Sequence, residues 1–151
     1  NKGQWKSNQK NCGKINKKEA QKEANTNIYL GFRSKDFVVL EDEFKNVANN
    51  LIITTDDGTY GNSGFAINYL EKDLNEKNID AIYACGPLQM LKAVKKLAES
   101  KNIFCQISLE QRMACGVGAC MGCSVKLTTE DVNYARVCKD GPVFDSKSVE
   151  I

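Results

Sequence analysis

The sequence predicts an α/β fold with a parallel sheet, followed by a small cysteine-rich domain. Two observations lead to this prediction: apolar strand-like runs alternate with helical patterns after Asn27, and the texture changes to Gly, Cys and short strand candidates after Glu110. With 151 residues, 42% of them hydrophobic, the chain can bury a core, and its length allows one domain or two small ones.

The expected elements follow one another in a regular order. Short apolar runs bounded by turn residues predict strands, and apolar residues at helical spacing predict helices, the second opened by Pro87. The strand candidates are 28–32, 51–54, 81–84, 103–107 and 124–127, and the helix candidates are 63–77 and 88–100. Residues 37–40 form a further short strand or part of a loop. Repeated strand–helix–strand units predict parallel strands with right-handed crossovers.

Three segments result from this pattern. Residues 1–26 are polar and Lys-rich, and predict a solvated segment that is poorly packed. Residues 27–107 form the α/β domain and residues 108–151 the cysteine-rich domain. The chain begins with Asn, which favours a trimmed product or a fragment.

Charge and hydropathy exclude two classes of partner. The formal net charge is +2, with 21 Lys plus Arg against 19 Asp plus Glu, so the whole chain carries no electrostatic footprint for nucleic acid. The apolar runs fall far short of the roughly 18 residues that span a bilayer. We therefore expect neither a nucleic-acid nor a membrane partner.

The chain contains seven cysteines and no histidine. Without histidine, Cys/His zinc fingers, Rieske-type ligation and Ser-His or Cys-His nucleophiles are excluded. An odd cysteine count, clustered late in the chain without a signal-peptide pattern, favours a reducing, cytoplasmic setting. Cys12 and Cys105 indicate no function.

The strongest motif is a cysteine loop with the spacing C-x4-C-x2-C, followed after fourteen intervening residues by a fourth cysteine. This is the plant-type pattern for a [2Fe–2S] cluster. Glycines between the cysteines give the backbone the freedom to curl around a small cluster, so that N–H groups can point at sulfur. The predicted ligands are Cys115, Cys120, Cys123 and Cys138.

Rival interpretations of the loop fit less well. A four-cysteine zinc site normally has two short C-x2-C knuckles, whereas here three cysteines share one loop. Two disulfides disagree with the reducing setting, and buried inert thiols do not explain the glycines. A zinc-binding interaction domain without redox chemistry remains the alternative from a different class.

A nucleotide site is expected beyond the carboxyl ends of the parallel strands, where such sheets bind ligands. Gly86 allows a close backbone approach, and the helix that follows presents N–H groups and a positive dipole end. Arg33 is suited to a phosphate or an adenine. Ordinary turns, a helix start and a solvated charge explain these residues equally well. The candidates are Gly31, Arg33, Ser34, Asp57, Gly58, Cys85, Gly86 and Pro87.

Electron counting links the two domains. A nicotinamide gives up a two-electron hydride, whereas a [2Fe–2S] cluster takes one electron at a time. A flavin between them solves this mismatch.

Several segments resemble the electron-transfer subunit of NAD-dependent dihydroorotate dehydrogenase. The cysteine loop and the ending that follows Cys138 are highly specific, and the nucleotide motifs belong to the broader ferredoxin-reductase-like class. The resembling segments are 31–34 (GFRS), 55–61 (TDDGTYG), 83–87 (YACGP), 108–120 (SLEQRMACGVGAC) and 136–144 (RVCKDGPVF).

The resemblance implies a ferredoxin-reductase-like nucleotide lobe and a subunit with FAD and a [2Fe–2S] cluster. Such a subunit exchanges electrons with NAD and with an FMN-containing catalytic subunit in pyrimidine biosynthesis. Cys85, Gly86 and Pro87 would lie by the nicotinamide and flavin, and Gly31 to Ser34 with Asp57 and Gly58 would line the dinucleotide. An alternative with the same chemistry is the small subunit of an NADH-dependent ferredoxin or sulfide reductase.

Two departures from the family stand out. Nothing corresponds to the flavin-binding β-barrel, and the Gly-rich loop after the first nucleotide-domain strand is absent. In this class that strand is central, in the order 3-2-1-4-5, so its loss would leave a gap with unpaired backbone groups. The sequence therefore predicts an incomplete NAD-binding domain from the C-terminal portion of a longer subunit, which alone binds FAD and NAD poorly.

Overall fold

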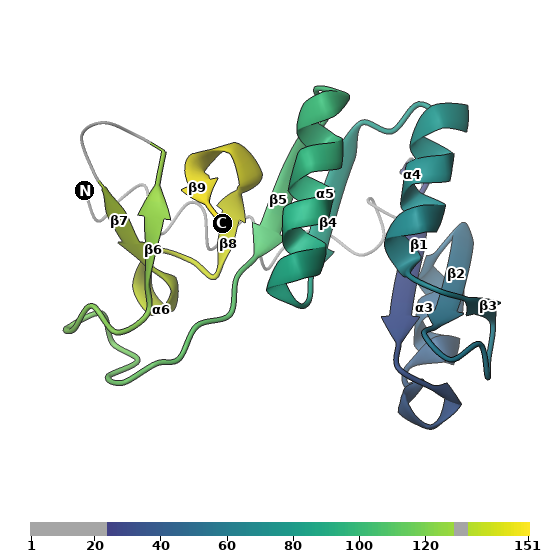
Figure 1. Ribbon diagram of the computed structural model, residues 1–151, viewed down its shortest axis with the longest axis horizontal. Helices are drawn as coiled ribbons and strands as arrows, with labels where there is room; N and C mark the ends of the chain where they lie inside the picture. The colour runs from purple at the N-terminus through teal and green to yellow at the C-terminus, as the bar shows by residue number, and fades with distance from the viewer. Residues whose placement is uncertain (1–23, 129–132) are drawn as a thin grey trace. The chain divides into compact units, whose positions relative to one another are not determined.

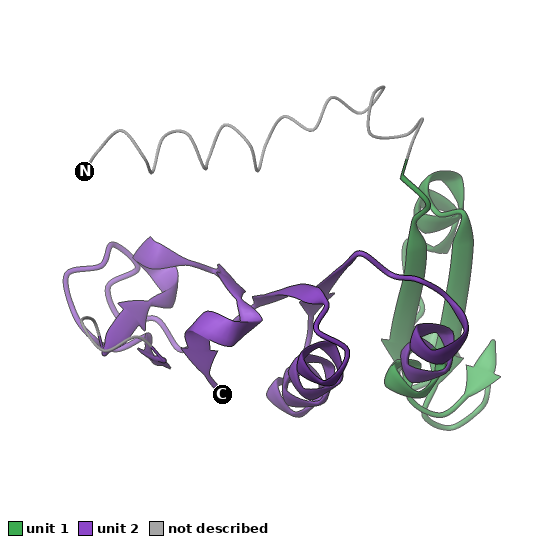
Figure 2. Cartoon of the chain, turned by 90° about the horizontal axis from the view of Figure 1, so that it is seen from above, with its two compact units in different colours: residues 1–69 green, residues 70–151 purple. Residues whose placement is uncertain are grey.

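The computed structural model describes residues 24–128 and 133–151 (Figure 1). The chain divides between Tyr69 and Leu70 into two compact units, which are coloured separately in Figure 2. Most of the expected polar segment, residues 1–23 with Cys12, lies outside the described residues. The division falls within a helix, whereas the sequence predicts a boundary near residues 107–111.

The first unit contains a parallel sheet with the strand order β1-β2-β3. Strand β1 (Asn27–Phe32) pairs along its whole length with β2 (Asn50–Thr55), and β2 pairs briefly with β3 (Asn62–Ser63). The buried positions lie on β2, at Ile53 and the two threonines that follow it. Both long strands lie within one residue of their predicted bounds, because β-branched and apolar residues fill them.

The connection between β1 and β2 contains a short helix that the sequence did not suggest. A 3-10 turn, η1 (Lys35–Phe37), precedes a loop over residues 38–40, so the loop alternative for residues 37–40 is correct. Helix α3 (Glu41–Val47) then begins after Leu40, which has the left-handed φ of 58°. Three acidic residues lie in its first turn, where their negative charges stabilise the helix by interacting with the positive end of its dipole.

A hydrogen-bonded trio joins α3 to the loop after β2. The Tyr60 hydroxyl donates to the Glu41 carboxylate at 2.9 and 3.0 Å, and Lys45 Nζ lies 2.6 Å from Glu41 Oε1. The hydrogen bond from Lys45, followed by that from Tyr60, lowers the pKa of Glu41 below its ordinary 4.5.

Glu41→Gln is expected to lower the urea midpoint of the chain slightly at neutral pH. A carboxyl group whose folded pKa is lowered stabilises the fold above its unfolded pKa, and this contribution is lost as the pH falls through the folded value. The difference between variant and wild type should therefore shrink below pH 4.5. Urea titrations at pH 7 and pH 3.5 measure it, and a difference that is the same at both values contradicts the ion-pair account.

The second unit begins within α4 (Ala66–Glu76) and continues with a strand, helix and strand. Strands β4 (Ala81–Cys85) and β5 (Phe104–Ser108) are parallel, and α5 (Leu88–Ser100) connects them. Leu91, Val94 and Ala98 of α5 are buried, as are Ile82 and Ile107 of the strands. The apolar stripe predicted for this helix is thus its core face.

The cysteine-rich segment adds one strand to the edge of this sheet and forms a small sheet of its own. Strand β8 (Val143–Asp145) pairs antiparallel with β5, and β6 (Ser124–Leu127) lies between β7 (Tyr134–Arg136) and β9 (Val149–Glu150). Helix α6 (Val137–Asp140) and the 3-10 turn η2 (Ser146–Ser148) complete the segment. Val125, Ala135, Val137 and Val149 are its buried core.

Parallel pairing is confirmed, but the sheet differs from the expected one. The four predicted strands of the nucleotide lobe lie in two sheets within the described residues, β1 with β2 and β4 with β5. Strands β1 and β4 are each at the edge of their sheet. Each therefore has one side without a strand partner among the described residues.

Candidate iron–sulfur and nucleotide sites

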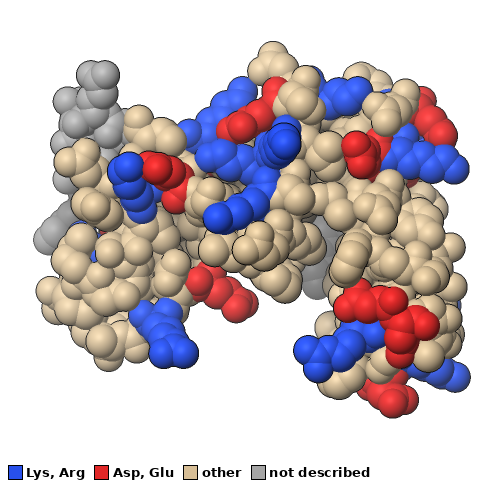
Figure 3. Space-filling view, viewed as in Figure 1, with Lys and Arg blue, Asp and Glu red and all other residues tan. Residues whose placement is uncertain are grey.

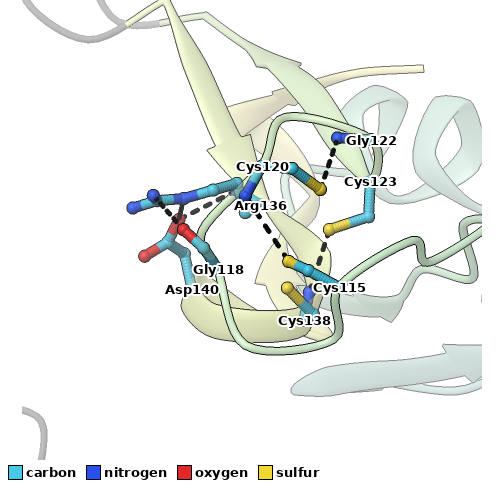
Figure 4. Close-up of polar contacts among 8 residues, drawn as sticks. All are labelled: Cys115, Gly118, Cys120, Gly122, Cys123, Arg136, Cys138 and Asp140. Atoms are coloured by element: carbon cyan, nitrogen blue, oxygen red, sulfur yellow. Dashed lines mark hydrogen bonds and ion pairs between the residues drawn. The ribbon is translucent and has the colours of Figure 1, made fainter.

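The four predicted ligand cysteines come together in the second unit. Three lie on the loop between β5 and β6, and Cys138 comes from α6, which follows β7 directly. Figure 4 shows their sulfur atoms pointing toward one another inside the curve of the loop. Gly116 and Gly118 have φ of 68° and 77°, so the predicted role of glycine in curling this loop is confirmed at these two positions.

The cysteines are arranged as two pairs. Cys115 and Cys120 form the first pair, in which the Cys120 N–H donates to Cys115 Sγ at 3.4 Å. Cys123 and Cys138 form the second, in which the Cys138 N–H donates to Cys123 Sγ at 3.5 Å. Among residues 24–128 and 133–151, no three Cys, Asp or Glu side chains converge closely enough to hold one metal ion.

Backbone N–H groups control the acidity of these thiols. The N–H of Cys120, followed by that of Val117, lowers the pKa of Cys115 to about 6, with a smaller contribution from Ala119. The N–H of Cys138 lowers the pKa of Cys123, and the hydrogen bond to Cys123 raises that of Cys138. Sulfur atoms surrounded by N–H donors favour thiolates, which are the form that binds metal.

In the first unit, the loops after β1 and β2 are hydrogen-bonded to each other. The Lys35 N–H donates to Thr59 Oγ1 at 2.9 Å, and that hydroxyl donates to Asp57 Oδ1 at 2.6 Å. The Asp57 N–H reaches the Arg33 carbonyl at 3.4 Å. Arg33, Ser34, Asp57 and Gly58 therefore lie along one edge of the sheet, as predicted from parallel strand ends.

Gly31 and Gly58 differ in what their positions require. A Cβ at Gly31 would make ordinary contacts of 3.5 Å or more, so the fold does not require glycine there. Gly58 has a φ of 69° and closes the turn after β2. Asp57 accepts hydrogen bonds from the hydroxyl and the N–H of Thr59, which lower its pKa.

In the second unit, Gly86 and Pro87 line a cavity of about 380 Å³. Cys85 is exposed at the end of β4, Gly86 has a φ of 154°, and Pro87 precedes the N-terminus of α5. The other walls come from the segment after β5, from β6 and from the end of the chain. The cavity is within the size range of small-molecule sites.

The sequence did not suggest three charged residues of this cavity. Lys126 Nζ lies 2.5 Å from Glu150 Oε2, and both line the cavity with Glu110. Lys126 and Glu150 face each other because β6 pairs with β9, a register that no local pattern reveals. Glu110 lies in residues 108–120, one of the segments that carry the family resemblance, but nothing in its residue type indicated that it lines a cavity.

Comparison with known proteins gives a family match for the cysteine-rich segment. Residues 110–150 match the model of the iron–sulfur cluster binding domain of dihydroorotate dehydrogenase B. The electron transfer subunit of dihydroorotate dehydrogenase B (NAD(+)) from Caldanaerobacter subterraneus subsp. tengcongensis is 41% identical over 123 residues, which are 81% of this chain and 48% of the relative. That from Fusobacterium nucleatum is 45% identical over 128 residues, 83% of this chain and 48% of the relative.

Over most of its length, the chain is similar to electron transfer subunits of dihydroorotate dehydrogenase B. It spans about half the length of the curated relatives it matches. A solved structure of an NADH-dependent reduced ferredoxin–NADP oxidoreductase, described for flavin-based electron bifurcation, superposes with a TM-score of 0.70. It is 31% identical and covers 83% of this chain and 44% of that chain. The resemblance drawn from the sequence motifs is thus confirmed.

Two further observations concern the surface and the helices of the chain. Acidic and basic side chains are mixed over the face drawn in Figure 3. Within the described residues, every helix is too short or too polar to cross a bilayer.

Proposed function

We propose that this chain is part of an oxidoreductase subunit that moves electrons between a nicotinamide dinucleotide, FAD and a [2Fe–2S] cluster. In this proposal it serves an FMN-containing dihydroorotate dehydrogenase catalytic subunit in pyrimidine biosynthesis, in the cytoplasm. The arrangement of Cys115, Cys120, Cys123 and Cys138 carries the proposal, and the family supports it. Thiolate ligands need a reducing compartment, which agrees with the cytoplasmic assignment.

The pairing of the thiols suits two irons better than one zinc. A tetrahedral zinc ion needs four sulfur atoms at about 2.3 Å from one point. A [2Fe–2S] cluster spreads its four thiolates over two irons. The described residues contain two cysteine pairs, Cys115 with Cys120 and Cys123 with Cys138, and no three donors converge on one point. This arrangement fits a [2Fe–2S] cluster.

For the nucleotide side, we assign Gly31, Arg33, Ser34, Asp57 and Gly58 to the dinucleotide. Cys85, Gly86 and Pro87 are assigned to the nicotinamide and flavin. A cavity at the N-terminus of the 13-residue helix α5 offers N–H groups to a polar ring or a phosphate. Bound FAD would divide the two electrons of a hydride into single-electron steps, which the cluster requires.

The lobe of residues 27–107 is proposed to be an incomplete ferredoxin-reductase-like domain, and residues 108–151 its cluster domain. In the order 3-2-1-4-5, the missing first strand would lie between the strands that correspond to β1 and β4. The edge positions of β1 and β4 in their sheets support this assignment. The match covers only 48% of a curated relative, which is therefore longer than this chain.

The contact with the catalytic subunit is proposed to lie at the apolar rim of the cysteine loop. This rim consists of Met113, Val117 and Met121, which are 53%, 76% and 55% exposed. Exposed apolar residues beside a redox group suit an interface that excludes water and shortens the path for electrons.

Val117→Asp is expected to weaken binding of the catalytic subunit by about tenfold, because a carboxylate would be buried at an apolar contact. Isothermal titration calorimetry of the two subunits, purified without oxygen, measures this. Val47→Asp is the matched control, since Val47 is a similarly exposed valine on α3, at 51%. Equal effects of the two variants would reject the rim as the contact.

A second candidate is a small subunit of an NADH-dependent ferredoxin or sulfide reductase. The solved oxidoreductase with a TM-score of 0.70 is the observation that favours it. The protein that copurifies with the chain distinguishes the two, because a dihydroorotate dehydrogenase subunit supports the first candidate and a ferredoxin or sulfide reductase subunit the second.

The experiment that tests the proposal is an anaerobic visible spectrum with iron, sulfide and zinc assays on the same sample. About two irons and two sulfides per chain are expected for the plant-type site. One zinc and no visible band would reject electron transfer and leave the zinc-binding interaction domain.

A further inference from the structure

One arginine outside the cysteine loop holds the backbone of that loop. Arg136, the last residue of β7, donates from its guanidinium Nη1 to the Gly118 carbonyl at 2.7 Å (Figure 4). Asp140 fixes the arginine through one carboxylate oxygen. Asp140 Oδ2 accepts a hydrogen bond from the backbone N–H of Arg136 at 2.8 Å, and it also lies 3.4 Å from the guanidinium Nε. With 29% of its side chain exposed, Arg136 is partly shielded from water.

The carbonyl that Arg136 holds belongs to the same peptide unit as the N–H of Ala119. A peptide unit is planar and trans, so its C=O and its N–H point in opposite directions. Fixing the Gly118 oxygen on Arg136 therefore turns the Ala119 N–H away from Arg136. That N–H makes a small contribution to the lowered pKa of Cys115.

The preceding N–H group is directed in the same way. The Gly118 N–H opposes the raised pKa of Cys138, and the Ala119 N–H helps to lower that of Cys115, so two consecutive N–H groups act on one cysteine of each pair. Successive N–H groups that face one concave side form an anion-binding nest. Arg136 holds this nest from its outer side.

Gly118 needs such a restraint. It has a φ of 77° and no side chain, so the peptide units on either side can rotate with little steric resistance. Its place is also confined, since a Cβ would come within 2.9 Å of Lys139 Cβ. No other side chain is seen to hydrogen-bond the Gly118 carbonyl in the part of the chain that the structure describes.

We infer that Arg136 and Asp140 are positioning residues, which hold the Gly118–Ala119 peptide unit so that backbone N–H groups point at the cluster ligands and raise the reduction potential. The inference rests on the proposed function, since it presumes the cluster. Hydrogen bonds to ligand sulfur stabilise the more negative, reduced form. Losing them lowers the potential and opens the loop to water.

The test is an EPR-monitored redox titration of the anaerobically purified chain, together with iron content and the rate of iron loss to a chelator. Arg136→Gln is expected to shift the reduction equilibrium about tenfold toward the oxidised form, which is about 59 mV for one electron. Arg136→Lys keeps the charge but loses the planar fork that spans Gly118 and Asp140, so it should shift in the same direction. Iron loss should be faster in both variants.

Asp140→Ala separates geometry from charge. Removing a negative charge near the cluster would by itself favour reduction, whereas loosening Arg136 favours oxidation, so the inference predicts a shift toward the oxidised form. Arg112→Gln is the control for charge, because Arg112 is exposed and no hydrogen bond or ion pair of it is seen within the described chain.

The outcomes distinguish the inference from the proposed function. A wild-type chain without iron and sulfide rejects the proposed function, and the inference with it. A wild-type cluster whose potential and iron loss are unchanged in Arg136→Gln and Arg136→Lys rejects the inference alone. A shift toward the reduced form in Asp140→Ala also rejects the inference, because it indicates a charge effect only. The same holds if Arg136→Lys has the wild-type potential while Arg136→Gln and Arg112→Gln shift equally.

Discussion

Cys138→Ala is expected to abolish the visible spectrum of the chain and to reduce its iron from about two per chain to well below one. Cys138 is the one proposed ligand that does not lie on the loop between β5 and β6, and it supplies half of the second thiol pair. Without it, one iron would keep a single thiolate from the chain. Iron, sulfide and zinc assays after anaerobic reconstitution measure the result.

Cys105→Ala is the matched control for this variant. It also leaves six cysteines, but Cys105 lies on β5, is 2% exposed, and has its pKa raised by burial. A buried thiol of this kind is a poor metal ligand, so we expect iron and sulfide to stay at about two per chain. Retention of two irons in Cys138→Ala, or equal losses in both variants, would contradict the four-cysteine assignment.

Gly61→Ala is expected to destabilise the first unit by about 3 kcal/mol. A non-glycine residue in the left-handed region costs about 1–2 kcal/mol, and overpacking adds about 1–3 kcal/mol. Gly61 has a φ of 64°, and its Cβ would overlap the backbone carbonyl oxygen of Ile53, which a strand holds in place. Urea unfolding followed by far-UV circular dichroism measures the change.

Gly64→Ala isolates the backbone part of this effect. Gly64 also has a positive φ, 98°, but a Cβ there would meet no atom within 4 Å. Its expected cost is therefore about 1–2 kcal/mol. If the two alanine variants unfold at the same urea concentration, the close approach of Gly61 to β2 adds nothing to the destabilisation caused by Gly61→Ala. This account of the turn would then be wrong.

The regular elements were predictable where local pattern and tertiary burial agree. Helix α5 has its predicted bounds, because Pro87 marks its start and Leu91, Val94 and Ala98 form one apolar stripe. Helix α3 was missed although its acidic first turn was visible, since seven residues are too few for a clear period. Strands β7, β8 and β9 have two or three residues each and exist through long-range pairing.

The convergence of the four cysteines was predictable, because their spacing along the chain matches the pattern of a known cluster site. Their surroundings were not, since Arg136 reaches Gly118 from 18 residues away and Lys126 meets Glu150 across two strands. These contacts depend on strand register, which is fixed by the folded sheet. The division of the parallel strands into two sheets also depends on partners that lie outside the local pattern.

Strand β8 has a mechanical consequence. Ile107 of β5 is paired with Phe144, the Leu109 N–H donates to the Pro142 carbonyl, and Lys95 of α5 donates to the Val149 carbonyl. Swinging the cysteine segment away from β5 would break these hydrogen bonds together, so we do not expect it to act as a hinged arm. If the proposed cluster and a ligand at the end of β4 are bound, the tunnelling distance between them would be set once, when the chain folds. Electron transfer over that distance should therefore be insensitive to solvent viscosity.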